Sequence, residues 1–155
     1  MNKTIENIHK TRQFLLAGIE SLDVATLNKV PAGFSNNIIW NVGHLVAAQQ
    51  SVCYVRAGLR HLIDTPFFEA YKPGSKPEAW VDEQAISQVK KLLFTSLDDL
   101  AMHYEQKLFD HYQPLTTRYG AVINNIDDAI AFMPYHEGLH GGYILALKRI
   151  IGQQA

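Results

Sequence analysis

Apolar residues recur every three or four positions in four long segments of the chain, the spacing that places side chains on one face of a helix. The first segment spans roughly residues 2–22, and its stripe consists of Ile5, Ile8, Arg12, Leu15, Ile19 and Leu22. The second segment begins after a capping residue, Ser35 or Asn36, and extends to about Gly58. Both segments are predicted to be helices.

Two further segments keep the same period. Asp82 is a suitable N-cap for a third helix, whose pattern continues for about 30 residues until Pro114 ends it. A fourth helix is expected to start near Asn125. Pro134 lies within this last segment, which predicts either a kink in a continuous helix or a helix that begins at Pro134.

The connections between these segments are irregular. Residues 60–80 contain three prolines and one glycine, and residues 114–125 read PLTTRYGAVINN. No segment has the alternating pattern of a strand. We therefore predict one all-α domain over residues 1–155, a four-helix bundle of the up-and-down or the long-crossover type. The connection 60–80 is long enough to cover part of a site.

Composition narrows the classes of function. The 155 residues include 14 basic and 15 acidic side chains, a net charge of -1, without the basic face that nucleic acids require. No stretch reaches the ~18 apolar residues of a membrane span, and the N-terminal segment lacks the apolar core of a secretion signal. The single cysteine, Cys53, suits a reducing compartment. We expect a cytoplasmic protein that binds neither nucleic acid nor membranes.

The candidate chemistry lies in the sequence HEGLH, residues 136–140. His136 and His140 are four residues apart, so a helix places both imidazoles on one side, where they can converge on one metal ion. Glu137 points about 100 degrees away, so it either flanks the metal or faces another helix. The HExxH pattern occurs in metallopeptidases, but no His, Glu or Asp follows the motif here as a third ligand. A peptidase is therefore disfavoured.

A third ligand must come from upstream, and His44 is the best candidate because it lies on the polar stripe of the second helix. The alternative is that each histidine is a core or rim side chain with one hydrogen bond. The pair at i and i+4, with a third histidine on another inward face, favours a metal site. His61 and Asp64 are weaker candidates.

The remaining histidines have no partner at ligand spacing. His103 and His111 are interpreted as structural, with His111 in the last turn of the third helix. Gly138, Gly141 and Gly142 each lower the stability of the helix, so their presence in it needs an explanation. Either another helix approaches this surface closely, or the glycines leave room beside the metal.

Two motifs together resemble the DinB-like proteins, four-helix bundles related to bacterial thiol-dependent S-transferases. The first is NNIIWNVGHLVAAQ at 36–49, and the second is HEGLHGGYI at 136–144. The resemblance covers nearly the whole chain and implies that His44, His136 and His140 bind a metal, with water or substrate completing an open site. The chain departs from the family pattern at Tyr143, where many members have glutamine. The resemblance also implies a homodimer.

Three hypotheses for function follow. The first is a metal-dependent transferase, using a low-molecular-weight thiol, or a hydrolase, acting on a small molecule between the second and fourth helices. The second is a non-catalytic bundle tied by its ion, and the third is a dimerisation module. Glu137 is the candidate base beside the metal, and Tyr143 a hydrogen-bond donor to ligand. Zinc or nickel is the expected ion, and release is expected below about pH 6.5, where histidines protonate.

Overall fold

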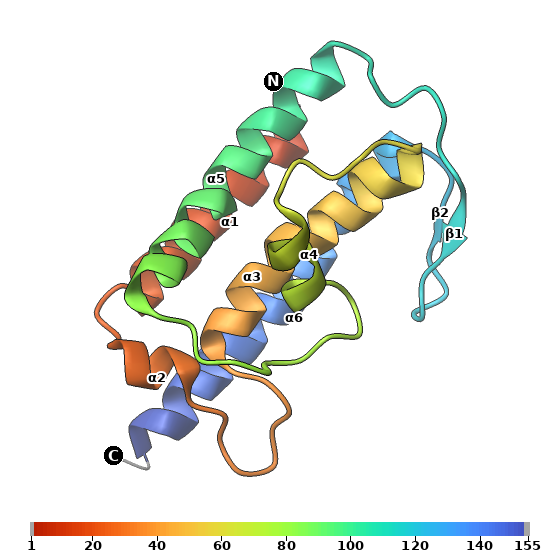
Figure 1. Ribbon diagram of the computed structural model, residues 1–155. Helices are drawn as coiled ribbons and strands as arrows, with labels where there is room; N and C mark the ends of the chain where they lie inside the picture. The colour runs from red at the N-terminus through yellow and green to blue at the C-terminus, as the bar shows by residue number, and fades with distance from the viewer. Residues whose placement is uncertain (1, 154–155) are drawn as a thin grey trace.

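The computed structural model describes residues 2–153, and its regular structure is almost entirely helical (Figure 1). Its four longest helical segments are α1 (Lys3–Ile19), α3 (Ile38–Gln49), α5 (Glu83–Glu105) and α6 (Ile126–Gln153). The all-α prediction is confirmed. None of the helices within residues 2–153 is long and apolar enough to cross a membrane.

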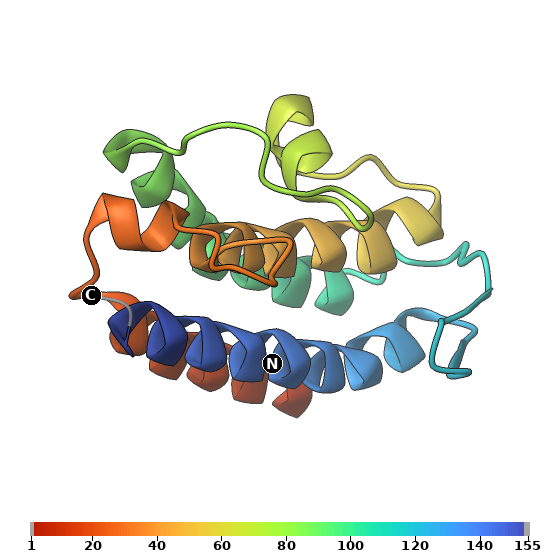
Figure 2. The same cartoon turned by 90° about the horizontal axis from the view of Figure 1, so that it is seen from below.

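The four long helices form two layers, with α1 beside α6 and α3 beside α5 (Figure 2). α1 also contacts α5, and α3 also contacts α6, so α1 and α3 lie diagonally across the bundle. The connections from α1 to α3 and from α5 to α6 therefore both cross the bundle. Of the two topologies predicted, the structure has the crossover type.

α3 is the central element, and every residue from Ile38 to Gln49 is buried. Its outer side is covered by the short helix α4 (Thr65–Tyr71), which lies within the connection between α3 and α5 (Figure 2). The Asp64 carboxylate caps α4 by accepting a hydrogen bond from the Phe67 amide. The long connection thus covers the polar side of α3, where His44 lies.

The predicted boundaries of the first two helices need small corrections. α1 ends at Ile19 rather than near residue 22, and Asp23 then caps a separate short helix, α2 (Val24–Asn28). The cap of α3 is Asn37, whose side chain accepts from the Trp40 amide, rather than Ser35 or Asn36.

The end of the second helical segment near Gly58 is confirmed. After Gln49 the helix widens into a π-helical turn, Gln50–Tyr54, and then tightens into a 3-10 turn, Val55–Ala57. Gly58 ends the segment with a φ of 71°, in the left-handed region that glycine adopts without steric cost. π-helical turns of this kind are frequent near functional sites.

The third helix is shorter than predicted, because α5 ends at Glu105 and not at Pro114. Lys107 adopts a left-handed φ of 57°, its amide donates to the Tyr104 carbonyl, and the Leu108 amide donates to the His103 carbonyl. This is the hydrogen-bond pattern of a helix stop that usually requires glycine. His111 therefore lies beyond the helix, and its prediction as a last-turn residue was wrong.

The connection between α5 and α6 forms a small hairpin, which the sequence pattern did not predict. Its strands β1 (Leu115–Thr116) and β2 (Val122–Ile123) pair antiparallel, with Leu115 opposite Ile123. Two-residue strands are too short to show an alternating pattern. The hairpin matters because β2 packs against α6 and brings its turn toward the histidines.

α6 is continuous through Pro134, so the alternative in which the helix begins there was wrong. The Asn125 side chain accepts from the Asp128 amide and caps the helix, as expected for a start near this residue. Pro134 is solvent-exposed, and its missing N–H removes one helical hydrogen bond without ending α6. Both histidines of the motif consequently lie on one uninterrupted helix.

Candidate metal centre

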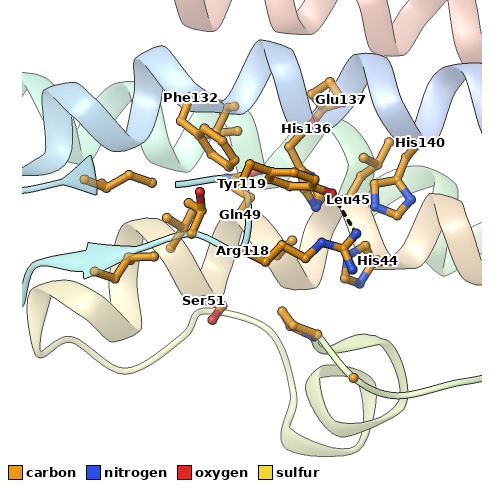
Figure 3. Close-up of a pocket in the computed structure, with 18 of the residues that line it drawn as sticks. His44, Leu45, Gln49, Ser51, Arg118, Tyr119, Phe132, His136, Glu137 and His140 are labelled. Carbon is orange, nitrogen blue, oxygen red and sulfur yellow. Dashed lines mark hydrogen bonds between the residues drawn. The ribbon is translucent and has the colours of Figure 1, made fainter. Parts of the chain in front are cut away.

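The structure brings His44 of α3 together with His136 and His140 of α6 (Figure 3). One ring nitrogen from each lies within 4.8 Å of the others. The ring centroid of His44 is 5.2 Å from that of His136 and 4.6 Å from that of His140. Three imidazoles this close together can bind one metal ion.

Hydrogen bonds fix the tautomers of two of these rings. The Nδ1 atom of His44 is 2.8 Å from the Tyr71 carbonyl oxygen, which can only accept, so Nδ1 carries the proton. His140 Nδ1 is 2.8 Å from the Asn41 side-chain oxygen. The Asn41 amide nitrogen donates to Asn36 and to the Asn37 carbonyl, so its oxygen is again an acceptor. In both rings Nε2 is therefore left with the lone pair that a metal requires.

Asn41 is a residue whose role the sequence did not reveal, although it shares the polar stripe with His44. Replacing it with alanine is expected to weaken metal affinity about 10- to 100-fold, because His140 loses the acceptor that orients it. Competition titration with a chromophoric chelator measures this change. Ser51→Ala is the matched control, since Ser51 lines the same cavity and lies away from the Asn41–His140 hydrogen bond; unchanged affinity in Asn41→Ala would contradict the assigned role.

Burial keeps the three imidazoles neutral. It lowers the pKa of His136 to about 3, with further contributions from His140 and His44. Burial likewise lowers the pKa of His140 to about 4, with His44 adding to the effect. For His44, burial lowers the pKa while the hydrogen bond to Tyr71 partly opposes it. In the folded protein the lowered pKa values weaken the competition between protons and a metal, so the expected pH of metal release moves down from about 6.5.

The same shifts predict how the metal-free protein responds to acid. In the unfolded chain a histidine titrates near 6.5, whereas His136 and His140 titrate near 3 and 4 when folded. Below pH 6.5 the unfolded state therefore binds more protons, and stability falls as the pH falls toward 4. Urea unfolding at pH 7.5, 6.0 and 5.0 measures the slope. It should be shallower in His136→Gln, and equal slopes would contradict the prediction.

The position of His44 depends on close packing between α3 and α4. Trp40 stacks on the His44 ring with centroids 4.7 Å apart and an interplanar angle of 12°. Gly43 lies directly against the ring of Tyr71, where a Cβ atom would be 2.5 Å from Cδ1. Glycine at 43 thus lets α4 approach until the Tyr71 carbonyl reaches His44.

A cavity of about 530 Å³ opens beside the histidines. Its walls come from α3, the π-helical turn, α6, the hairpin and the segment after α4, and they are largely apolar, with side chains such as Leu45 and Phe132 (Figure 3). All three histidines line it. This volume is in the range of sites that hold a small molecule.

Glu137 forms a buried ion pair with Arg12 of α1. Its Oε1 accepts from Arg12 Nη2 at 2.6 Å, and both carboxylate oxygens accept from Arg12 Nε. Arg12 is fully buried and also donates to the Leu93 and Leu45 carbonyls. Of the two orientations expected for Glu137, it has the one that faces another helix, although its side chain still lines the cavity.

The sequence pattern did not identify Arg12 as the partner of Glu137. A signal was present, because Arg12 is a charged residue in the middle of the apolar stripe of the first helix. Tyr143, the predicted hydrogen-bond donor, packs edge-on against Phe34 with centroids 5.5 Å apart, and it is not among the residues that line the cavity. Its role toward a ligand stays a prediction.

The weaker candidates lie elsewhere. His61 stacks on Phe68 and bonds the Ile63 carbonyl through Nδ1, while Asp64 caps α4. His103 Nδ1 is 2.9 Å from the Tyr54 hydroxyl, in agreement with a structural role.

The glycines of α6 do not mark a close helix contact within the chain. A Cβ atom added at Gly138, Gly141 or Gly142 would meet nothing within 4 Å among the described residues. Close approach of another helix of this chain is therefore excluded as their explanation.

Comparison with known proteins agrees with the geometry. No curated protein matches the sequence. The profile of the DinB superfamily matches residues 7–144, which include both motifs, all three histidines and the greater part of the bundle. The chain therefore belongs to the DinB superfamily.

Proposed function

We propose that the protein is a metal-dependent enzyme that transfers a low-molecular-weight thiol to a small electrophilic substrate in the cavity beside the histidines. One observation carries this proposal: three neutral imidazoles converge on the wall of a cavity of about 530 Å³. Within residues 2–153 no Cys, Asp or Glu joins the three histidines as a further ligand. A coordination position thus stays available to a ligand in the cavity.

A divalent ion with an open position lowers the pKa of a thiol or water that occupies it, which makes a nucleophile available at neutral pH. The protein contributes the remaining features. Hydrogen bonds to Tyr71 and Asn41 orient the imidazoles, and Trp40 restricts His44 from the other side. The apolar walls hold the substrate, while its electrophilic carbon forms the bond to sulfur and the leaving group departs with the electron pair.

Metal analysis tests the first part of the proposal. Protein purified without a histidine tag should contain close to one equivalent of zinc or nickel, and His44→Ala should lose it after dialysis. His103→Ala is the matched control, because His103 bonds Tyr54 and lies outside the cluster. Equal metal content in wild type and His44→Ala would remove His44 from the site.

Thiol transfer tests the second part. Metal-loaded protein is incubated with monochlorobimane and, in turn, with cysteine, glutathione, bacillithiol or mycothiol, and adduct formation is followed by fluorescence. We expect acceleration with one thiol, lost in His44→Ala. Hydrolysis of an ester probe without any thiol dependence would favour the hydrolase instead. Metal binding with neither activity would favour a non-catalytic bundle in which the ion has a structural role.

We further propose a cytoplasmic homodimer. α6 exposes Leu139 and Leu145, 41% and 48% accessible, on a helix where Gly142 leaves open space for another surface. Such apolar exposure is typical of association surfaces. Light scattering should give twice the chain mass for wild type and the chain mass for Leu145→Glu.

The proposed cytoplasmic location is supported by Cys53, because its buried free thiol suits a reducing compartment.

A further inference from the structure

An arginine stands at the mouth of the cavity, opposite the histidines. Arg118 lies in the turn between β1 and β2, a turn closed by hydrogen bonds from the Thr117 amide to the Ala121 carbonyl and from the Gly120 amide to the Thr117 carbonyl. Arg118 is exposed, and its side chain lines the cavity and points toward His44 (Figure 3). The hairpin therefore presents a cation to the site.

Tyr119 holds this side chain in place. Arg118 Nη2 donates to the Tyr119 hydroxyl at 2.6 Å, and the guanidinium carbon is 4.9 Å from the centroid of the same ring. Tyr119 in turn packs edge-on against Tyr135 of α6, with centroids 5.3 Å apart. The guanidinium is thus anchored to α6, although the turn itself is exposed.

Arg118 has no carboxylate partner among the ion pairs of residues 2–153. The one acidic side chain that lines the cavity is Glu137, and Arg12 already neutralises it. Arg56 adds a second cation to the cavity wall. After burial, the charge of Arg118 is a further cause of the lowered pKa of His44 and His140. A metal ion would add to this excess of positive charge.

Cations in this arrangement repel one another unless an anion lies between them. We infer that Arg118 binds the oxyanion, a carboxylate or a phosphate, of a substrate or thiol whose reacting atom lies at the histidine cluster. The inference deepens the proposed function and rests on it. A guanidinium is suited to this task because its planar N–H groups match two oxygens of such an anion.

The cavity also specifies the rest of the ligand. The walls carry apolar side chains such as Phe132, Leu45 and Met133 beside polar ones such as Gln49, Ser51 and Thr117, and the acidic Glu137 is paired with Arg12. A ligand with an anionic end and an apolar portion fits these walls better than a cation. The ligand class is therefore an organic acid or phosphate ester with an aromatic or alkyl portion.

The first test uses metal-free protein, so that it does not depend on the proposed reaction. Binding of phenylacetate, phenyl phosphate and the neutral phenylacetamide is followed by NMR titration of the backbone amide signals of Thr117 and Gly120, which are present in wild type and in the variants. Wild type should bind at least one anion about tenfold more tightly than the amide, and Arg118→Gln should abolish that preference. Arg60→Gln, an exposed arginine outside the cavity, should keep it.

The two anions show which anionic group of the ligand Arg118 binds. A preference for phenyl phosphate indicates a phosphate ester, and a preference for phenylacetate indicates a carboxylate. Equal affinity for both anions and the amide in wild type would overturn the inference. So would an Arg118→Gln variant that weakens the anions and the amide to the same degree, because Arg118 would then only shape the hairpin.

The second test uses zinc-loaded protein with 3-mercaptopropionate and its amide. Calorimetry should show tighter binding of the carboxylate in wild type and equal binding of the two in Arg118→Gln. If neither thiol binds zinc-loaded protein while metal-free protein still prefers anions, the thiol-transfer proposal fails and the role of Arg118 stands. If both thiols bind equally in wild type, the role of Arg118 fails and the thiol site stands.

Discussion

Replacing Arg12 with methionine is expected to destabilise the protein by about 3 to 5 kcal/mol, because the Glu137 carboxylate is then left buried without a counter-charge. Glu137 is only 3% exposed, and Arg12 supplies three of the hydrogen bonds to its oxygens. Two backbone carbonyls, of Leu93 and Leu45, also lose a donor. Chemical unfolding followed by circular dichroism at pH 7.5 measures the loss.

Two controls separate the ion pair from general damage. Lys10→Met removes a cation from the same helix, but its pair with Glu6 is exposed, so little change is expected. The double variant Arg12→Met with Glu137→Met removes both charges and should recover a large part of the stability. If the double variant is as unstable as Arg12→Met alone, the buried charge is not the cause of the loss.

Replacing Gly43 with alanine is expected to destabilise the fold by about 1 to 3 kcal/mol and to weaken metal affinity at the same time. The new Cβ would lie 2.5 to 2.7 Å from three ring atoms of Tyr71, which cannot move without displacing α4. The Tyr71 carbonyl is the acceptor that orients His44, so its displacement also disturbs a ligand. Thermal unfolding and chelator competition measure the two effects.

Gly138→Ala is the matched control, with the opposite expected sign. Gly138 lies in α6 between the two ligands, and a Cβ there meets nothing within 4 Å. Alanine should stabilise the helix by about 0.5 to 1 kcal/mol and leave metal affinity unchanged. If Gly138→Ala and Gly43→Ala both destabilised the protein equally, contact with Tyr71 would not explain the effect at Gly43.

The sequence predicted the helices and the pair His136 and His140 because both depend on short-range periodicity, whereas His44 followed from helix packing and the family resemblance. Spacing of three to four residues determines which side chains share a face, and His136 and His140 follow from that rule alone. Capping residues placed the starts of α5 and α6 correctly, at Asp82 and Asn125. These features require no knowledge of how distant segments pack.

What the sequence did not predict depends on long-range contacts or on unusual backbone conformations. The early end of α5 rests on Lys107 in a left-handed conformation, which residue type does not favour. The hydrogen bond between Asn41 and His140 joins residues 99 positions apart. Arg118 lines the cavity together with the histidines only because the hairpin of β1 and β2 turns back over the cavity. None of these has a signature in local composition.

The separation of the histidines along the chain also determines when the site can form. His44 must find its partners after the closure of a long loop, a step whose entropic cost grows with loop length. The growing chain therefore lacks a complete set of ligands until α6 has been synthesised and has packed against α3. With the metal site proposed above, metal acquisition would be a late event that reports on complete folding, and a chain that stalls with α6 undocked would lack the ligands to retain an ion.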